Sequence, residues 1–518
     1  MQALGGHRLP LRDPCMEGTR LDILQQIETE IKKTNGHNVI WIRGSPGVGK
    51  SALAASITSR LQYQKRHVTW FRFDRTESTT ITTNALWRVV ARDLARWYPS
   101  IRQQLAQGNT ELSSSNIDHL FKTLIEEPLS ALKDISHEEI PVIVIDALDE
   151  CGGLRHDSSG MGNYEGLLRT LKRWALADCL RKFKLIITSR PEDQIAQTFP
   201  ASISIHVNIP SGNDVKPGDS ASKDIQAFLM SCLSAMGMDE AWVSEACGYL
   251  VPQAAGMFIW ATTVAKFLKK NPKQRFDIIK TKEHERGADR FEELYSLYSA
   301  VIRTSFHDLE EEEIQAFTSV IGATIFAKQP LDDTMLMKLP GVDMLKFIRD
   351  GLVSVIDSGP ILCFHHRSFE DFLLSSSFLQ YLPKLSGVQN RSLHERQLAV
   401  LCLRTMASSE LHFNMCNLKS SNVRNMDITA TDKSAISPLV SYSSQFWADH
   451  LVQNQCEESF INTVKFMMHE KLLFWIEAMS ILGKAHEVSA ILKRALEWLG
   501  LAVRPEFISY TTTLRLTH

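Results

Sequence analysis

The chain has 518 residues, 44% of them hydrophobic and 22% charged, a composition typical of globular proteins with length for roughly three or four compact units. Its 57 Lys and Arg residues nearly balance its 59 Asp and Glu residues. Net charge therefore gives no reason to expect nucleic acid or an anionic membrane as an obligate partner, although it leaves a local basic patch open.

The nine cysteines are scattered along the chain, with no CxxC pair and no Cys/His cluster at the spacing of a zinc site. Such a pattern suits a reducing compartment better than secretion. Residues 1–20 lack the apolar core of a signal peptide, because Gly5, His7, Arg8, Pro10 and Arg12 interrupt it. We therefore expect a cytoplasmic protein.

One uncharged stretch, Ala246–Ala265, has the length of a membrane-spanning helix. Pro252 lies near its start, and Gly248 and Gly256 interrupt it. These residues favour a turn followed by a buried helix, so we expect no membrane span.

Between residues 38 and 207, short apolar runs alternate with longer segments of helical pattern, which is typical of a parallel sheet covered by helices. Runs without polar alternation, such as Val142–Ile145, suit strands that are buried on both faces. The predicted strands are Asn38–Ile42, His67–Phe73, Val142–Ile145, Lys184–Thr188 and Ile203–Val207.

The composition changes beyond the last of these strands. Asn208–Asp219 is rich in Pro, Gly, Ser and Asp and predicts an exposed linker. From Lys223 onward apolar residues recur mainly at helical spacing, and Trp447, Trp475 and Trp498 lie on apolar stripes that predict core positions. We find no repeat of fixed period, so a solenoid or propeller is not expected.

One segment in this helical region has a strand pattern. Two apolar runs, Leu352–Ile356 and Ile361–Phe364, flank the turn sequence Asp357–Pro360 and predict a β-hairpin. Helices followed by one hairpin suggest a winged helix. The expected parts are an N-terminal segment at 1–36, a three-layer α/β domain at 37–210, a helical domain at 211–289, a winged-helix domain at 290–385 and a C-terminal helical bundle at 386–518.

A glycine-rich loop lies between the first predicted strand and a helical segment. It satisfies GxxxxGK[ST] and consists of Gly44, Ser45, Pro46, Gly47, Val48, Gly49, Lys50 and Ser51. Glycines let backbone N–H groups turn toward phosphate oxygens, and the helix N-terminus adds partial positive charge. Lys50 is expected to reach the β- and γ-phosphates, and Ser51 to ligate Mg²⁺.

Acidic residues follow the third predicted strand. Asp146 ends that strand, where a carboxylate can hold Mg²⁺ through water beside the phosphates. Asp149 and Glu150 follow at the same tip, and one of the two carboxylates could orient the attacking water.

An arginine follows the fourth predicted strand. Arg190 emerges at the same edge of the parallel sheet as Asp146, which suits a guanidinium that senses a γ-phosphate. The sequence has no NKxD element, and Asp146–Asp149 at the end of the third strand lacks the DxxG pattern of GTPases, so adenine is favoured over guanine by that absence alone. ATP and ADP with Mg²⁺ are the expected ligands, and the α/β domain at 37–210 is expected to be a P-loop NTPase. No HExxH or GxSxG motif supports another chemistry.

These residues resemble a known family. The loop GSPGVGKS at 44–51, the tip VIDALDEC at 144–151 and KLIITSRPE at 184–192 are similar to successive motifs of the NACHT branch of the STAND NTPases, in particular the fungal set with a nephrocystin-3-like P-loop domain. Gly18–Arg20, Asp224–Ile225 and Gly256–Ala261 also fit. The resemblance covers roughly residues 15–500.

The resemblance gives His366 a role. In related NLR proteins a winged-helix histidine at an FxH position contacts the β-phosphate of ADP, and His366 occupies that position after Phe364. Without the resemblance, His366 is a histidine packed beneath the hairpin. The proline of the GxP motif found in many relatives is absent near Phe258 and Ile259, which leaves the contacts on the adenine side open.

The resemblance implies a switch in which ADP holds the closed state, exchange for ATP permits homo-oligomerisation, and slow hydrolysis resets it. In fungi such proteins act in non-self recognition and programmed cell death, with an effector or sensor partner that the sequence does not identify. Relatives commonly carry an effector and a repeat array that are lacking here, so we expect a reduced member, a fragment or a misassigned gene product. Two alternatives stay open: a constitutive ATPase whose winged helix contacts DNA, and a non-enzymatic scaffold stabilised by nucleotide.

Overall fold

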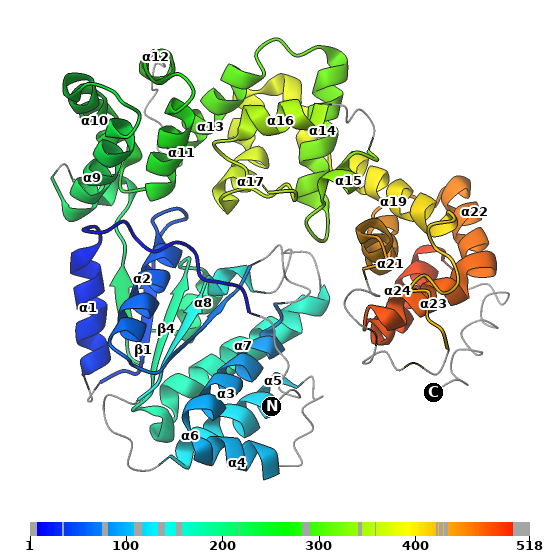
Figure 1. Cartoon of the computed structure of the whole chain (residues 1–518), viewed down its shortest axis with the longest axis horizontal. Helices are drawn as coiled ribbons and strands as arrows, with labels where there is room; N and C mark the ends of the chain where they lie inside the picture. The colour runs from blue at the N-terminus through cyan, green and yellow to red at the C-terminus, as the bar shows by residue number, and fades with distance from the viewer. Residues whose placement is uncertain are drawn as a thin grey trace. The chain divides into compact units, whose positions relative to one another are not determined.

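The computed structural model describes residues 8–33, 36–74, 81–107, 116–132, 140–151, 158–216, 218–281, 291–339, 344–357, 359–420, 423, 428 and 434–500. The chain forms two compact units. The first comprises Met1–Ala300 and His366–Ser368, and the second comprises Val301–His365 and Phe369–His518. Figure 1 labels their helices and strands.

The first unit is built on a parallel sheet of five strands in the order β2-β3-β4-β1-β5. The strands are β1 Val39–Arg43, β2 Val68–Arg72, β3 Val142–Asp146, β4 Lys184–Ser189 and β5 Ile205–Asn208. All five predicted strands are confirmed, with ends that differ by at most two residues. Every residue of β3 and β4 is buried, which explains why both are apolar runs without polar alternation.

Helices cover both faces of this sheet and make three layers (Figure 1). Val142 and Val144 face a core formed with α1 (Leu21–Lys32) and α2 (Lys50–Tyr63). Ile143 and Ile145 face the opposite core. The second layer contains α3 Thr83–Trp97, α4 Pro99–Gln107, α5 Ile117–Phe121, α6 Glu127–Ser130, α7 Ser158–Leu176 and α8 Asp193–Thr198. The three-layer α/β architecture expected from the sequence is therefore present.

Helices follow the sheet in the first unit. They are α9 Ser220–Ser234, α10 Glu240–Ala254, α11 Phe258–Leu268, α12 Pro272–Lys280 and the first part of α13 Glu292–Ser305. The uncharged stretch Ala246–Ala265 is divided between α10 and α11, with a turn at Ala255 and Gly256. Within the described part of the chain, no helix combines the length and apolarity that crossing a membrane requires.

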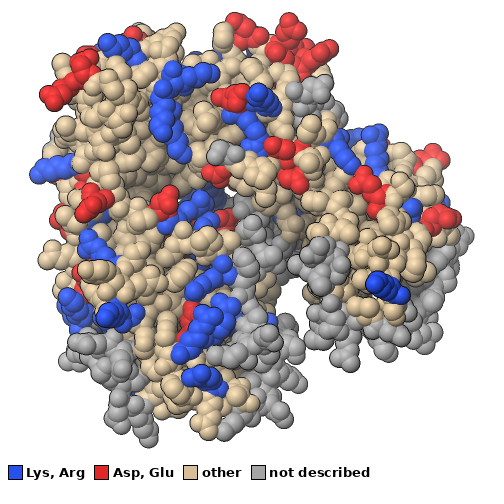
Figure 2. All heavy atoms as spheres, viewed as in Figure 1, with Lys and Arg blue, Asp and Glu red and all other residues tan. Residues whose placement is uncertain are grey.

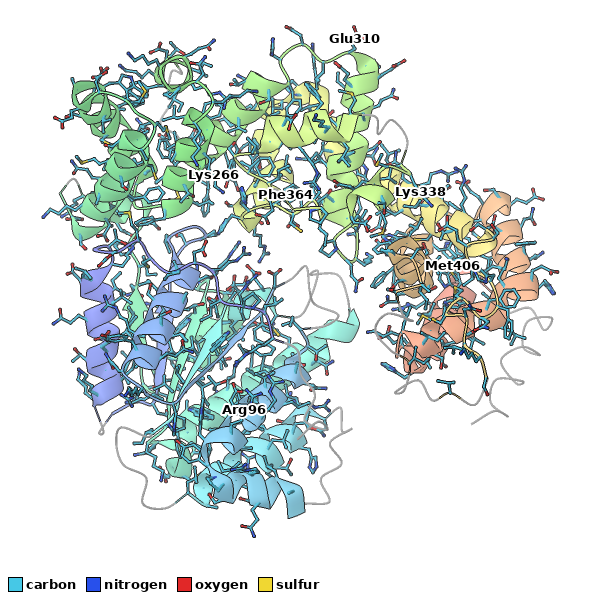
Figure 3. All side chains as sticks on the ribbon, in the orientation of Figure 1. Arg96, Lys266, Glu310, Lys338, Phe364 and Met406 are labelled. Carbon is cyan, nitrogen blue, oxygen red and sulfur yellow. The ribbon has the colours of Figure 1, made fainter. Side chains whose placement is uncertain are left out.

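The second unit is helical. Its helices are α14 Glu311–Phe326, α15 Asp333–Leu336, α16 Leu345–Leu352, most of α17 Arg367–Leu373, α18 Ser376–Tyr381, α19 Arg391–Ala407, α21 Pro438–Leu451, α22 Glu458–Phe466, α23 Leu472–Ile481 and α24 Val488–Trp498. Buried Met406 of α19, labelled in Figure 3, accepts a hydrogen bond from Ser444 of α21 at 3.7 Å. Trp447 and Trp475 are fully buried core residues, as predicted.

The predicted hairpin is wrong in its first strand. Leu352 ends α16, because Leu345, Ile348 and Leu352 form a buried stripe at helical spacing. Among the described residues of this segment, Ile356 and Phe364 form only a single antiparallel bridge. The winged-helix assignment and the predicted domain boundaries stay predictions.

A buried carboxylate connects α3 to the edge strand β2 and to the N-terminal segment. Asp93 is 3% exposed and accepts hydrogen bonds from Thr69 Oγ1 at 2.7 Å and from Arg8 Nη1 at 2.6 Å. Arg96 approaches its other oxygen at 3.3 Å. Asp93 thus satisfies donors from three separate segments.

We expect Asp93→Ala to lower the free energy of unfolding by about 2–4 kcal/mol, because it leaves a buried hydroxyl and a guanidinium without their acceptor. Urea titration followed by circular dichroism measures the loss. The control is Asp118→Ala, which removes an ion pair between exposed Asp118 and Arg169. It should change stability by less than about 1 kcal/mol. Equal losses in both variants would contradict this account of Asp93.

Candidate functional site

The glycine-rich loop joins β1 to α2 at the carboxyl end of the sheet (Figure 1). Gly47 and Gly49 have φ values of 77° and 95°, in the left-handed region that glycine adopts without strain. Gly49 is also the N-cap of α2, and no side chain caps this end. The first N–H groups of α2 are therefore left for a ligand, and the helix dipole favours an anionic one.

The Lys50 ammonium lies inside the loop. Its Nζ donates to the carbonyl oxygen of Gly44 at 2.8 Å and to that of Ser45 at 3.0 Å. Burial lowers the pKa of Lys50 to about 8, and Asp149 is the largest opposing influence. A bound phosphate would offer this ammonium an anionic acceptor in place of neutral carbonyls.

Two further carbonyls of the loop are bound from outside it. The backbone N–H of Ile259, in the first turn of α11, donates to Gly47 O at 2.9 Å. Arg20 Nη2 donates to Val48 O at 2.9 Å. A Cβ on Gly47 would lie 2.0 Å from Ile259 Cγ2, so this position requires glycine for space as well as for conformation.

The other loop residues shape the cradle. A Cβ on Gly44 would lie 3.0 Å from Val48 Cγ2, and Val48 is fully buried. Ser45 Oγ accepts a hydrogen bond from Ser211 Oγ at 3.0 Å. Pro46 lies in the turn before Gly47. The sequence motif thus forms a turn held by close contacts.

Asp146 ends β3 with no exposed surface. Thr188 Oγ1 donates to its Oδ1 at 2.5 Å, and burial raises the pKa of this carboxyl while Thr188 and Ser51 oppose the rise. Oδ2 is buried and has no partner at ordinary hydrogen-bonding geometry among the described residues. The Asp146 carboxyl group thus has the Ser51 hydroxyl near it and one buried oxygen at which no hydrogen bond of ordinary geometry is made, which fits a divalent cation with oxygen ligands.

The described residues contain no group of three or more His, Cys, Asp or Glu side chains placed to hold a metal ion.

Asp149 and Arg190 pair with each other. Asp149 Oδ1 accepts the backbone N–H of Arg190 at 3.1 Å, and its Oδ2 lies 3.3 Å from Arg190 Nε. Both side chains are largely buried. The two predicted site residues are therefore neighbours, and a γ-phosphate would compete with Asp149 for the guanidinium.

Glu150 is partly buried beside these groups. Burial, Asp74 and Asp149 raise the pKa of Glu150 to about 7, and Arg367 opposes them. A carboxyl with this pKa exchanges protons near neutral pH, which suits a group that takes a proton from water.

His366 belongs to the first unit although it lies far along the chain. Its Nδ1 accepts the backbone N–H of Ser368 at 3.1 Å and lies 2.8 Å from the Ser368 hydroxyl, which is 2.7 Å from the Tyr298 hydroxyl. Burial and the positive charges of Arg190 and Lys50 lower the pKa of His366 to about 3. The ring is therefore neutral near pH 7, and this pattern assigns its proton to Nε2, leaving one donor.

Reasoning from sequence missed two contributions to this site. Thr188 was expected only as the end of a strand, yet its Oγ1 binds Asp146 and accepts the Ala147 N–H at 2.9 Å. The sequence feature that could have indicated this role is the position of Thr188, a residue with a hydroxyl group near the end of β4, the next strand along the chain after the one that ends in Asp146. Arg20, which the sequence marks only as part of the Gly18–Arg20 motif, donates a hydrogen bond to the loop itself.

Residues 18–190 match the family described as Nephrocystin 3, N-terminal. This part of the chain is similar to the N-terminal part of nephrocystin 3. The resemblance expected from the motifs is thereby confirmed. The matched range includes the loop, Asp146, Asp149, Glu150 and Arg190, and His366 lies outside it.

Two other proteins are similar to larger parts of the chain. The chain is 22% identical over 524 residues to the vegetative incompatibility protein HET-E-1 of Podospora anserina, with 91% of this chain covered. It spans 35% of the length of that relative. The chain is also similar to the solved structure of a STAND protein with a tetratricopeptide repeat sensor from Pyrococcus horikoshii, with 16% sequence identity and a TM-score of 0.37. The match covers 97% of this chain and 67% of that protein's chain.

We expect Glu150→Gln to stabilise the protein in a pH-dependent way. The folded pKa of Glu150, about 7, lies above the ordinary 4.5, so wild-type stability falls as pH rises through this interval and the buried carboxyl ionises. Glutamine stays neutral. The variant should therefore gain up to about 3 kcal/mol over wild type at pH 8 and little at pH 5.

Thermal or urea unfolding of both proteins at the two pH values measures this difference. Glu165→Gln, at an exposed position of α7, is the control and should give a difference from wild type that is independent of pH. A Glu150→Gln gain that is equal at pH 5 and pH 8 would show that Glu150 does not ionise in this interval.

Proposed function

We propose that the chain is a nucleotide-controlled switch of the NACHT and STAND class, which binds ADP or ATP with Mg²⁺ in the cytoplasm and hydrolyses ATP slowly. The observation that carries the proposal is the convergence, in one unit, of an uncapped glycine-rich loop, an acid with an unpaired buried oxygen, and a neutral histidine under the influence of Lys50 and Arg190.

In this proposal the chain's own groups bind the phosphates. The N–H groups of the loop and the first turn of α2 donate to phosphate oxygens, and Lys50 exchanges the carbonyls of Gly44 and Ser45 for the β- and γ-phosphates. Ser51 and Asp146 would hold Mg²⁺, which neutralises phosphate charge when bound.

The difference between ADP and ATP would be sensed by Arg190. In the described structure Asp149 binds both its backbone N–H and its guanidinium. A γ-phosphate that binds the Arg190 guanidinium would separate it from Asp149. This contact would exist with ATP and not with ADP, and only such a difference can shift the populations of the two conformational states. Glu150, with a pKa near 7, is the candidate to accept a proton from the attacking water.

His366 would hold the ADP state. Its neutral ring has Nε2–H as its free donor, and a diphosphate beside Lys50 and Arg190 would accept this hydrogen bond. Loss of this contact on exchange for ATP would permit the chain to self-associate. It would also permit binding of an effector or sensor protein that is not identified. The similarity to a fungal vegetative incompatibility protein supports a role in non-self recognition or programmed cell death.

A DNA-contacting winged helix gains no specific support. Figure 2 shows basic and acidic side chains interspersed on the visible face. Acidic residues gather at the start of α14, at Glu310–Glu313, where Glu310 is labelled in Figure 3.

We expect His366→Ala to release ADP roughly 10- to 100-fold faster, because one charge-assisted hydrogen bond is worth about 1.5–3 kcal/mol. The variant should also form larger assemblies with a nonhydrolysable ATP analogue. Displacement of fluorescent ADP and light scattering after size exclusion measure both. His486→Ala, at a position 74% exposed, is the matched control. If His366→Ala retains ADP as tightly as wild type, the proposed contact is absent.

A further inference from the structure

Arg20 is buried where the N-terminal segment enters α1. It is 3% exposed and has a φ of 58°, a left-handed conformation that a residue with a long side chain rarely adopts. Surrounding contacts must therefore hold it there. Burial lowers the pKa of its guanidinium, and Asp224 opposes this.

Two regions distant in sequence hold Arg20. Its backbone N–H donates to Asp224 Oδ2 on α9 at 3.1 Å, and its Nε lies 4.0 Å from the same oxygen. Its guanidinium carbon lies 4.9 Å from the centre of the Phe258 ring, at the start of α11. Nε is buried without a hydrogen-bond partner among the described residues. Asp224 is thus the countercharge for a cation that is removed from water.

The third contact of Arg20 acts on the phosphate-binding loop. Nη2 donates to Val48 O at 2.9 Å. In a trans peptide the C=O and the following N–H point in opposite directions. Fixing the Val48 carbonyl toward Arg20 therefore directs the Gly49 N–H away from Arg20. The same rule applies one residue earlier, where Ile259 N–H fixes Gly47 O and so directs the Val48 N–H.

We propose that Arg20 is a positioning residue of the phosphate cradle, held by Asp224, so that the direction of the Gly49 N–H is coupled to α9. The proposal rests on the proposed binding of nucleotide phosphates by this loop. Arg20 acts through the Val48 peptide, and its effect is on phosphates whatever base they carry. A contact of Arg20 with the base is the competing role that the experiment separates.

The test compares ADP with pyrophosphate, which has no base. Binding of both, with Mg²⁺, is measured by displacement of fluorescent ADP from wild type, Arg20→Met and Asp224→Asn. Methionine keeps the length of the side chain without its donors. We expect Arg20→Met to raise the dissociation constants of ADP and of pyrophosphate by the same factor, about tenfold for one hydrogen bond to a structured loop. Asp224→Asn should raise both by a smaller, equal factor.

The control is Arg60→Met, which removes an ion pair with Glu28 between α1 and α2 and should leave both constants unchanged. Arg20→Lys is included because it keeps the buried charge beside Asp224 if Arg20→Met fails to fold, and it should also weaken both ligands equally. Unchanged constants in the Arg20 variants, or weaker ADP with unchanged pyrophosphate, would overturn the proposal. If wild type binds neither ligand, the proposed function itself fails.

Discussion

The constraint on which the site depends is the direction of the peptide groups between Gly44 and Ser51. Their N–H groups can face a phosphate only if the carbonyls find donors elsewhere, since buried backbone groups are rarely left unpaired. Ile259 and Arg20 supply these donors for the carbonyls of Gly47 and Val48, and Lys50 supplies them for the carbonyls of Gly44 and Ser45 as long as no phosphate is bound. Each donor comes from a different element: α2, α11 and the segment before α1. The cradle is therefore a product of the first unit as a whole.

Basic and acidic side chains lie close together around this cradle. Lys50 and Arg190 lie among Asp146, Asp149 and Glu150, and burial together with these two cations lowers the pKa of His366 and keeps it neutral. Desolvation raises the pKa values of Asp146 and Glu150 and lowers that of Lys50, so each buried group depends on its neighbours for its charge. Phosphate oxygens entering such a cluster would redistribute several ion pairs at once. This sensitivity is the physical basis of the proposed switch.

The sheet and the loop could be predicted because their signals are local. Buried parallel strands require continuous apolar runs, and a phosphate turn requires glycines at fixed offsets between a strand and a helix. The pairing of Asp149 with Arg190 and the contact between Arg20 and Asp224, 204 positions apart, join segments whose spacing in sequence carries no information. The prediction of a hairpin was wrong for another reason. Leu352 fits the end of an apolar helical stripe as well as the start of a strand. In the structure Leu345, Ile348 and Leu352 are buried together on one face of α16, which favours the helix.

The central claim is that this loop holds a nucleotide as the ligand of a switch. Mass spectrometry of small molecules released from the purified protein tests it most directly. The account predicts ADP, close to one per chain, and its loss in Lys50→Ala. A wild-type protein that contains no nucleotide, and that takes up none when incubated with ADP and Mg²⁺, would contradict it.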